Sequence, residues 1–210
     1  MSSEQSSPAR GPVARAFRLA ADVVLGILAG IVLTLIATNL LLFAEGKSVF
    51  RTVNGWSYSM AAGKPGHSLL RRALMAAELP ATNVAEESVY WITAKDSAGQ
   101  RLNGQHAYLL HFPAGGLPPN DAFWSLTMTD AKKVLVANPV NRYAVGDRSG
   151  LAANADGSTD IYIQNTAPAD HQANWLPAPS AGFILWLRAC QPGKAVLDGT
   201  YQVPPVTEVK

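Results

Sequence analysis

The chain has 210 residues, of which 48% are hydrophobic and 15% are charged, and its formal net charge at pH 7 is +2. This length suits one globular domain with an appendage and argues against two large domains. The near-balance of charge disfavours nucleic acid as a partner, and Cys190, the single cysteine, leaves no intrachain disulfide.

An uncharged apolar run of 22 residues extends from Val23 to Ala44. About 20 apolar residues are needed to cross the hydrocarbon core as an α-helix, whereas the apolar part of a cleaved signal peptide has about 7 to 15 residues. The run also ends in Leu42-Phe43-Ala44, a poor match to a cleavage site of small residues. We therefore predict a transmembrane helix over residues 22–44 and a disordered cytoplasmic tail over residues 1–21, with a cleaved signal peptide as the alternative.

The charges beside this run set its predicted orientation. Arg10, Arg15 and Arg18 precede it, and Lys47 and Arg51 follow it. Cytoplasmic flanks of membrane helices carry an excess of Lys and Arg. We expect a single-pass protein of the bacterial inner membrane, with a cytoplasmic N-terminus and a periplasmic C-terminal domain.

Two glycines in the run, Gly26 and Gly30, have the spacing that lets two membrane helices approach closely. This spacing predicts a homo-oligomer formed through the helix. Small residues are common in membrane helices, so an incidental pair of glycines is the alternative.

Residues 45–66 are rich in Gly and Ser and end in a turn-forming Gly63-Lys64-Pro65-Gly66 cluster, which predicts a juxtamembrane linker. Trp56 and Tyr58 either dock this linker on the domain or lie at the membrane surface, because such rings combine an apolar body with a polar tip.

One amphipathic helix is predicted to follow, from Ser68 to Leu79. Ser68 is a good N-cap, the segment is rich in helix formers, and Pro80 stops it. The apolar residues that we expect to pack on the domain are Leu69, Leu70, Ala73, Ala76 and Ala77.

Beyond Glu87 the sequence consists of short β-branched and aromatic runs separated by turn residues. The predicted strands are Ser88 to Ala94, Ala107 to Phe112, Ala122 to Thr129, Val134 to Ala137, Arg142 to Val145, Thr159 to Asn165, Ala181 to Ala189 and Tyr201 to Val203. Asn-Gly and Asp-Gly pairs between them suit tight hairpins. The pattern predicts an all-β domain over residues 67–210, an antiparallel sandwich or barrel.

Several motifs within this domain can be named. They are Leu117-Pro118-Pro119, Ala122 to Thr127, Asn138-Pro139, Asn141-Arg142-Tyr143, Gly146-Asp147-Arg148, Asn154 to Ser158, Ile161 to Gln164, Asn174 to Ala178 and Leu197 to Tyr201. In this order they closely resemble the bacterial family called domain of unknown function 1214, over roughly residues 67 to 205. The resemblance implies a β-sandwich of jelly-roll type. Many relatives carry a second domain, the domain of unknown function 1254, ahead of it; we expect this chain to lack that companion and to carry the membrane helix in its place.

Polar and aromatic residues of these motifs form the candidate ligand site. They are Trp124, Asn141, Arg142, Tyr143, Asp147, Arg148, Asn174 and Trp175. Aromatic faces stack on the apolar face of a sugar or another polar small molecule, while Asn, Asp and Arg bind its hydroxyl groups. The alternative is structural: Arg142 and Asp147 pair to hold two loops, and Trp124 and Trp175 belong to the core.

No catalytic residue, metal ligand or cofactor is predicted. The carboxylates available for glycoside hydrolysis are Asp147, Asp156, Asp160 and Asp170, but nothing in the sequence pairs them. His106 and His111 are five residues apart in one expected strand, which points them to opposite faces and argues against a metal site. The chain has no Gly-x-Ser-x-Gly elbow, phosphate loop or dinucleotide fingerprint.

The sequence thus predicts a membrane-anchored envelope protein whose domain binds a ligand or has a structural or interaction role. Two alternatives stay open: a hydrolase acting on a carbohydrate or another polar envelope substrate, and an accessory subunit of a membrane complex.

Overall fold

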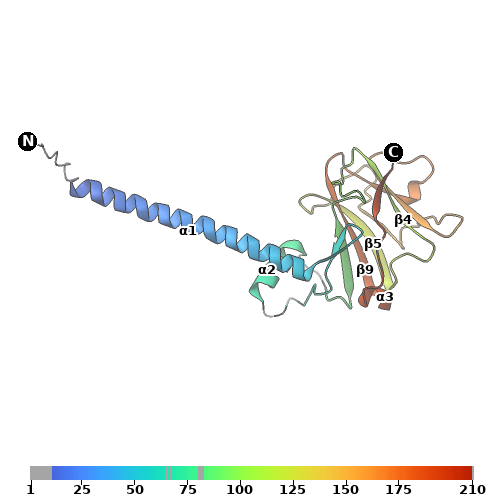
Figure 1. Cartoon of the computed structure of the whole chain (residues 1–210). Helices are drawn as coiled ribbons and strands as arrows, with labels where there is room; N and C mark the ends of the chain where they lie inside the picture. The colour runs from blue at the N-terminus through green and yellow to red at the C-terminus, as the bar shows by residue number, and fades with distance from the viewer. Residues whose placement is uncertain (1–10, 65, 67, 80–82, 210) are drawn as a thin grey trace, which may run out of the picture. The chain divides into compact units, whose positions relative to one another are not determined.

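The computed structural model describes residues 11–64, 66, 68–79 and 83–209 (Figure 1). The chain divides into two compact units, Met1–Ala44 and Glu45–Lys210. The first consists of most of one long helix, and the second contains two β-sheets.

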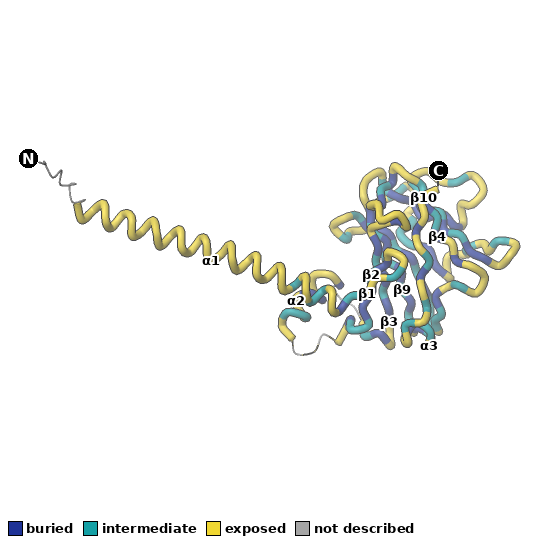
Figure 2. Tube along the Cα trace, in the orientation of Figure 1, coloured by how far each residue is buried: buried dark blue, intermediate teal, exposed yellow. Residues whose placement is uncertain are grey.

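Helix α1 spans Pro12–Val49, 38 residues, and is longer at both ends than the predicted membrane span. Residues 12–21, predicted to be disordered, are helical because Pro suits the first helical position and the Ala, Arg and Leu that follow are good helix formers. Its residues from Pro12 to Leu41 are all exposed (Figure 2), large apolar ones included, whereas Val49 at its end is buried. It is the one helix of the described residues that is long and apolar enough to cross a membrane, with a mean hydropathy of 2.5 over its most apolar window.

The second unit contains a six-stranded and a four-stranded sheet (Figure 1). The first has the order β1 (Arg51–Val53), β2 (Trp56–Tyr58), β3 (Ser88–Thr93), β9 (Phe183–Pro192), β5 (Asn120–Asp130) and β6 (Ala144–Gly146). The second has the order β10 (Val206–Val209), β4 (Ala107–Phe112), β7 (Thr159–Gln164) and β8 (Trp175–Pro177). The short helices α2 (Leu69–Glu78) and α3 (Lys194–Leu197) and the 3-10 helix η1 (Gln172–Asn174) complete the elements.

The prediction of an all-β domain is therefore confirmed as two sheets that follow a long apolar helix in the chain, with corrections in detail. Strands β7 and β8 pair in parallel, whereas the other paired strands are antiparallel. Residues 134–137 contribute only an isolated bridge, and residues 201–203 form no strand. The last strand is β10, which follows Pro204-Pro205 because proline cannot donate to a strand ladder.

The two sheets enclose one hydrophobic core. Leu110 and Ile161 from one sheet and Leu126, Leu185 and Leu187 from the other are all 0% exposed. Strands β7 and β9 both alternate between buried and partly exposed residues, as expected where one face meets the core. Figure 2 shows this interior as buried.

The predicted linker is instead the first part of the six-stranded sheet. Strands β1 and β2 form a hairpin, and β2 pairs with β3. The turn is Asn54-Gly55, both with positive φ, as a two-residue hairpin turn requires. Trp56 is 0% exposed and its Nε1 donates to Pro204 O at 2.8 Å. Trp56 and Tyr58 therefore dock this segment on the domain, which was one of the two alternatives predicted for them.

Helix α2 is present where expected, with Ser68 Oγ accepting from the Arg71 N–H at 3.2 Å. However, the side chains that it buries are Leu74 and Met75, whereas Leu69, predicted to face the domain, is 78% exposed. A second, smaller core cluster receives Met75 together with Val49 of α1. The helix is apolar on more than one side, so its periodicity alone did not identify the buried face.

Candidate functional site

Three of the eight predicted ligand residues are buried. Trp124 is 2% exposed and packs in the core, 5.6 Å between ring centroids from Phe112. Trp175 is 7% exposed and its Nε1 donates to Gln164 O at 2.8 Å. Asn174 is 4% exposed. These side chains stabilise the fold from within rather than offering a surface to a ligand.

The side chain of Arg142 makes hydrogen bonds to the backbone of a neighbouring segment. Its Nη1 donates to Gln172 O at 2.6 Å and to Trp175 O at 2.9 Å, which holds η1 and the start of β8. The described residues contain no ion pair between Arg142 and Asp147, and Asp147 is exposed. The predicted structural role for Arg142 thus has a different partner: two carbonyl oxygens in place of a carboxylate.

The remaining predicted residues lie nearer the surface. Tyr143 donates its hydroxyl to Asn141 Oδ1 at 3.4 Å, and Asn141 itself has a φ of 51°. Arg148 Nη2 donates to Ala122 O at 2.9 Å, with its guanidinium 4.8 Å from the centroid of the Phe123 ring. Each of these contacts holds a loop against its neighbour.

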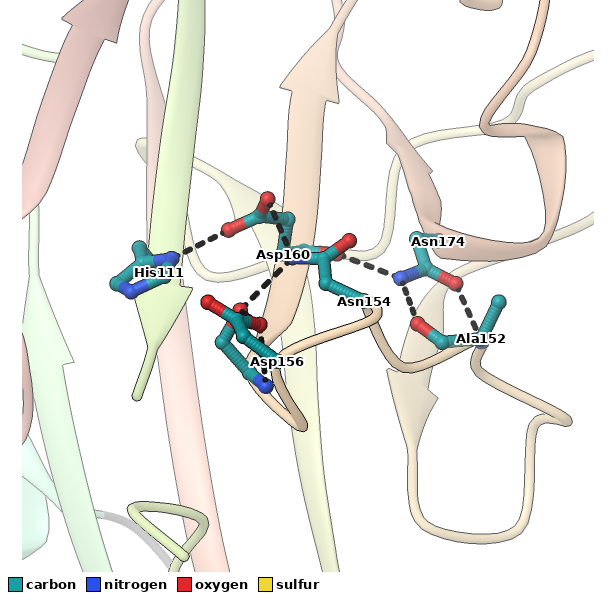
Figure 3. A network of polar contacts seen from close by, with 7 residues as sticks. His111, Ala152, Asn154, Asp156, Asp160 and Asn174 are labelled. Atoms are coloured by element: carbon teal, nitrogen blue, oxygen red, sulfur yellow. Dashed lines mark hydrogen bonds and ion pairs between the residues drawn. The ribbon is translucent and has the colours of Figure 1, made fainter. Parts of the chain in front are cut away.

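Asn174 connects the loop before β7 to the strand itself (Figure 3). Its Oδ1 accepts from the Ala152 N–H, and its Nδ2 donates to Ala152 O and to Asp160 O, each at 2.8 Å. The amide of Asn174 is buried, so these backbone groups supply the hydrogen-bond partners that its oxygen and nitrogen would otherwise lack.

A polar cluster around Asp160 lies beside this connection, and we call it the Asp160 cluster. Its members are His111, Asn154, Asp156, Ser158 and Asp160 (Figure 3). His111 and Asp160 are register partners on β4 and β7, and His111 Nδ1 lies 2.6 Å from Asp160 Oδ1. Asn154 Nδ2 donates to Asp160 Oδ2 at 2.9 Å. Both oxygens of this carboxylate are thus held.

The far end of the cluster is a turn. Ser158 donates its backbone N–H and its hydroxyl to Asp156 Oδ1, at 3.0 and 2.6 Å. These hydrogen bonds to the charged form lower the pKa of Asp156 from its usual value. Gly157, with a φ of 82°, allows the chain to reverse, so the predicted Asp156-Gly157 turn is present.

Within the Asp160 cluster, His111 and Asp160 are more exposed than the buried residues described above. The side chain of His111 is 51% exposed, and that of Asp160 is 16% exposed. Among the described residues, His111 Nε2 has no hydrogen-bond partner. Two residues along β7, Tyr162 stacks on His171 with ring centroids 4.5 Å apart. This outer sheet face therefore offers an oriented imidazole, a carboxylate and an aromatic pair.

An imidazole held at Nδ1 by a carboxylate has a fixed orientation and can exchange a proton at its other nitrogen. The described residues contain no group of three or more His, Cys, Asp or Glu side chains arranged to hold a metal ion. The pairing of His111 with Asp160 was not predicted from the sequence. No local signal connects them, because 49 residues separate them and only the strand register brings them together.

The fold and the Asp160 cluster together define the class of protein. It has a long apolar helix followed in the chain by a two-sheet β domain, and one outer sheet face of that domain is polar. The profile of the family described as protein of unknown function DUF1214 matches residues 87–194, slightly more than half of the chain. The chain belongs to this family.

Two solved structures are similar to the chain. The VPA0106 protein from Vibrio parahaemolyticus is 29% identical with a TM-score of 0.58, and the match covers 67% of this chain and 35% of that one. An uncharacterized protein from Burkholderia cenocepacia is 20% identical with a TM-score of 0.43, covering 59% of this chain and 30% of that one. The chain thus spans about a third of the length of these relatives. No curated protein matches it.

Proposed function

We propose that this protein is anchored in the bacterial inner membrane by α1, with its N-terminus cytoplasmic and its β domain in the periplasm. The observation that carries the anchor is the exposure of α1: Leu25 and Leu33 are each 66% exposed, and its most apolar window is 0% buried by the chain itself. A helix with an apolar surface of this length is long enough to cross the hydrocarbon core, where its backbone is satisfied internally. The cations Arg15 and Arg18 support the orientation.

Thiol labelling tests both parts of this proposal. In a Cys190→Ser background, cysteine is placed at Ser149, an exposed residue of the β domain, or at Ala14, near the start of α1. A membrane-impermeant maleimide should label the first position in intact spheroplasts and the second only after lysis. The reverse pattern would refute the orientation, and release of the protein by alkaline carbonate would refute the anchor.

For the β domain we propose the binding of a small polar ligand on the Asp160 cluster. The pair of a half-exposed His111 and a mostly buried Asp160, 2.6 Å apart, supports this role. A carboxylate and an imidazole can bind hydroxyl groups, while Tyr162 and His171 supply ring faces nearby. The exposed members of the original prediction, such as Asn141 and Arg148, are not needed for it.

The chain supplies a matched control for this site. His106 Nδ1 lies 2.8 Å from Glu208 Oε1, and its side chain is 51% exposed, the same fraction as that of His111. Thermal unfolding of the full chain in detergent should be measured with glucose, N-acetylglucosamine and glucuronate. A rise in Tm that His111→Gln removes and His106→Gln preserves would support the site, because a ligand of the native state stabilises it. Equal responses of the two variants would refute it.

A hydrolase is the second candidate function, and the orientation of His111 favours it. An imidazole fixed by Asp160 can act as a general base toward water. Chromogenic glycosides and esters are suitable probes. Turnover that is lost in His111→Gln and retained in His106→Gln would support the hydrolase, and absence of turnover with the wild-type chain would count against it for these substrates.

Two finer structural features belong to the same proposal. We propose that the two sheets form a jelly roll, supported by the order β3-β9-β5-β6 in one sheet and by the neighbours β4 and β7 in the other. We also propose that α1 associates with a second copy or an accessory partner through Gly26 and Gly30. An added Cβ at either glycine would meet no described atom within 4 Å beyond its chain neighbours and the adjacent backbone of its own helix. Changing both glycines to Ile should then lower the oligomer fraction in detergent.

A further inference from the structure

Helix α2 has a second apolar side that the β domain does not cover. Leu74 and Met75 are buried, while Leu69 is 78% exposed and Ala73 and Ala76 are also exposed. Residues 69, 73 and 76 lie on one side of a helix because they are spaced by four and three positions. The exposed side is thus an apolar stripe that lacks a partner among the described residues.

A loop after β5 contacts the C-terminal end of α2 and carries two exposed apolar side chains. Lys133 Nζ donates to Ala77 O at 2.8 Å and to Glu78 O at 3.1 Å, so it caps the C-terminal carbonyl groups of α2 with a positive charge. The next two residues, Val134 and Leu135, are 59% and 52% exposed. We call Leu69, Ala73, Ala76, Val134 and Leu135 the α2 surface.

The loop is built to hold this position. Asp130 Oδ1 accepts from the N–H groups of Lys132 and Val134, at 2.8 and 2.9 Å. Lys133 has a φ of 66°, which turns the chain at its tip. Val134 and Leu135, which follow Lys133 at this turn, are both exposed.

The partner of the α2 surface follows from the chain segment to which α2 is attached. Arg71 Nε lies 2.7 Å from Glu45 Oε1, and Leu74 approaches Gly46, 3.9 Å from where a Cβ would stand. Glu45 directly follows Ala44, the last residue of the uncharged run, and helical residues rise by about 1.5 Å each. The headgroup layer on each side of a bilayer is roughly 5 to 7 Å thick. If α1 spans the membrane, α2 therefore lies at the depth of the lipid headgroups.

The exposed charges around the α2 surface are consistent with a position among lipid headgroups. Arg72 on α2 and Lys132 on the loop are exposed, while Glu45 is paired with Arg71 and Glu78 with Lys133. Cations next to an apolar stripe are the combination that binds an anionic lipid surface. We propose that the α2 surface docks on the headgroup region of the membrane that α1 enters, through its apolar residues and these two cations. This inference rests on the proposed membrane anchor.

Spin labels at single cysteines test the docking in the full chain, reconstituted in nanodiscs of phosphatidylcholine and phosphatidylglycerol. The Cys190→Ser background carries a label at position 69, 134, 33 or 197, replacing Leu69, Val134, Leu33 or Leu197. Leu197 on α3 is 40% exposed and serves as the control. Labels at 69 and 134 should be several-fold less accessible to a water-soluble nickel complex than the label at 197, and more accessible to oxygen.

The label at position 33 separates the two proposals. If it is buried in hydrocarbon while 69 and 134 behave like 197, docking is refuted and the anchor stands. If position 33 is itself accessible to nickel, the anchor fails. Shielding at 69 and 134 that persists in detergent with dipolar broadening between labels would indicate a second copy as the partner and would overturn the lipid assignment. The double change Arg72→Glu with Lys132→Glu should restore nickel access at 134; unchanged shielding would refute the role of charge.

Discussion

The apolar side chains of α1 and those of the β domain are the same residue types in opposite surroundings. Leu25 and Leu33 are each 66% exposed, whereas Leu185 and Leu187 are 0% exposed. A helix satisfies its backbone hydrogen bonds internally and can stand alone in lipid, but a strand satisfies its own only beside other strands. Strands therefore bring their apolar faces together in a protein core. The difference teaches that an apolar sequence predicts removal from water, but does not tell whether lipid or protein surrounds it.

The largest expected effect on stability comes from truncation of the chain between and within the two regions. A fragment of residues 45–210 should keep the cooperative unfolding of the full chain, because none of the described residues before Glu45 belongs to the core of the β domain. A fragment of residues 67–210 loses Trp56, which is 0% exposed, and loss of a buried Trp costs about 3–5 kcal/mol. Urea unfolding followed by near-ultraviolet circular dichroism measures both. Equal midpoints for the two fragments would contradict the assignment of the hairpin to the sheet.

The same substitution made in each region gives the next largest difference. Leu187→Ala should lower the free energy of unfolding by about 2–5 kcal/mol, because it opens a cavity in the core. Leu33→Ala should change the unfolding of the β domain by less than about 0.5 kcal/mol. Chemical unfolding of the full chain in detergent is the measurement, and a comparable loss in both variants would mean that α1 is covered by protein.

Asparagines extend the comparison to polar groups. Asn174→Ala removes three part-buried hydrogen bonds to the backbone of Ala152 and Asp160, and each such bond contributes about 0.5–1.5 kcal/mol to stability. In α1, Asn39 Nδ2 donates to Leu35 O of its own helix at 2.8 Å. Asn39→Ala should leave the stability of the β domain unchanged. The prediction fails if the two variants unfold at the same urea concentration.

The smallest expected effect is a pH dependence confined to the β domain. The pKa of Asp156 is lowered by the hydrogen bonds from Ser158, so its contribution is present above the unfolded pKa of 3.8 and is lost as pH falls through the lower native value. Asp156→Asn keeps an oxygen acceptor and should flatten the decline of Tm below about pH 4. An unchanged slope would show that other carboxylates dominate; Asp198, whose pKa is lowered by Thr200, is the matched comparison.

Much of the architecture was predictable because it depends on local periodicity. The uncharged run predicted the long helix, and the β-branched and aromatic residues of Thr159 to Asn165 predicted a strand where β7 lies. Asn54-Gly55 was also a readable hairpin signal, but Gly and Ser around it led to a linker prediction for what is the edge of a sheet. Local composition described the turn and not its pairing partner.

The candidate site was the less predictable part. Trp124, Asn174 and Trp175 looked like ligand residues because aromatic and amide side chains serve equally well as binding groups and as internal ties. Their burial decides between these roles. Burial depends on which strand lies across the core, and this cannot be predicted from a single segment of the sequence.

By itself, the sequence determined the kind of protein: a long apolar helix followed by an all-β domain of the DUF1214 family. Only the tertiary structure decided that His111 meets Asp160, that Arg142 holds two carbonyl oxygens, and that α2 turns Leu69 outward. The physical reason is distance along the chain. Helix length and strand alternation arise from residues a few positions apart, whereas a polar pair or an exposed face arises from segments that meet only when the sheets assemble.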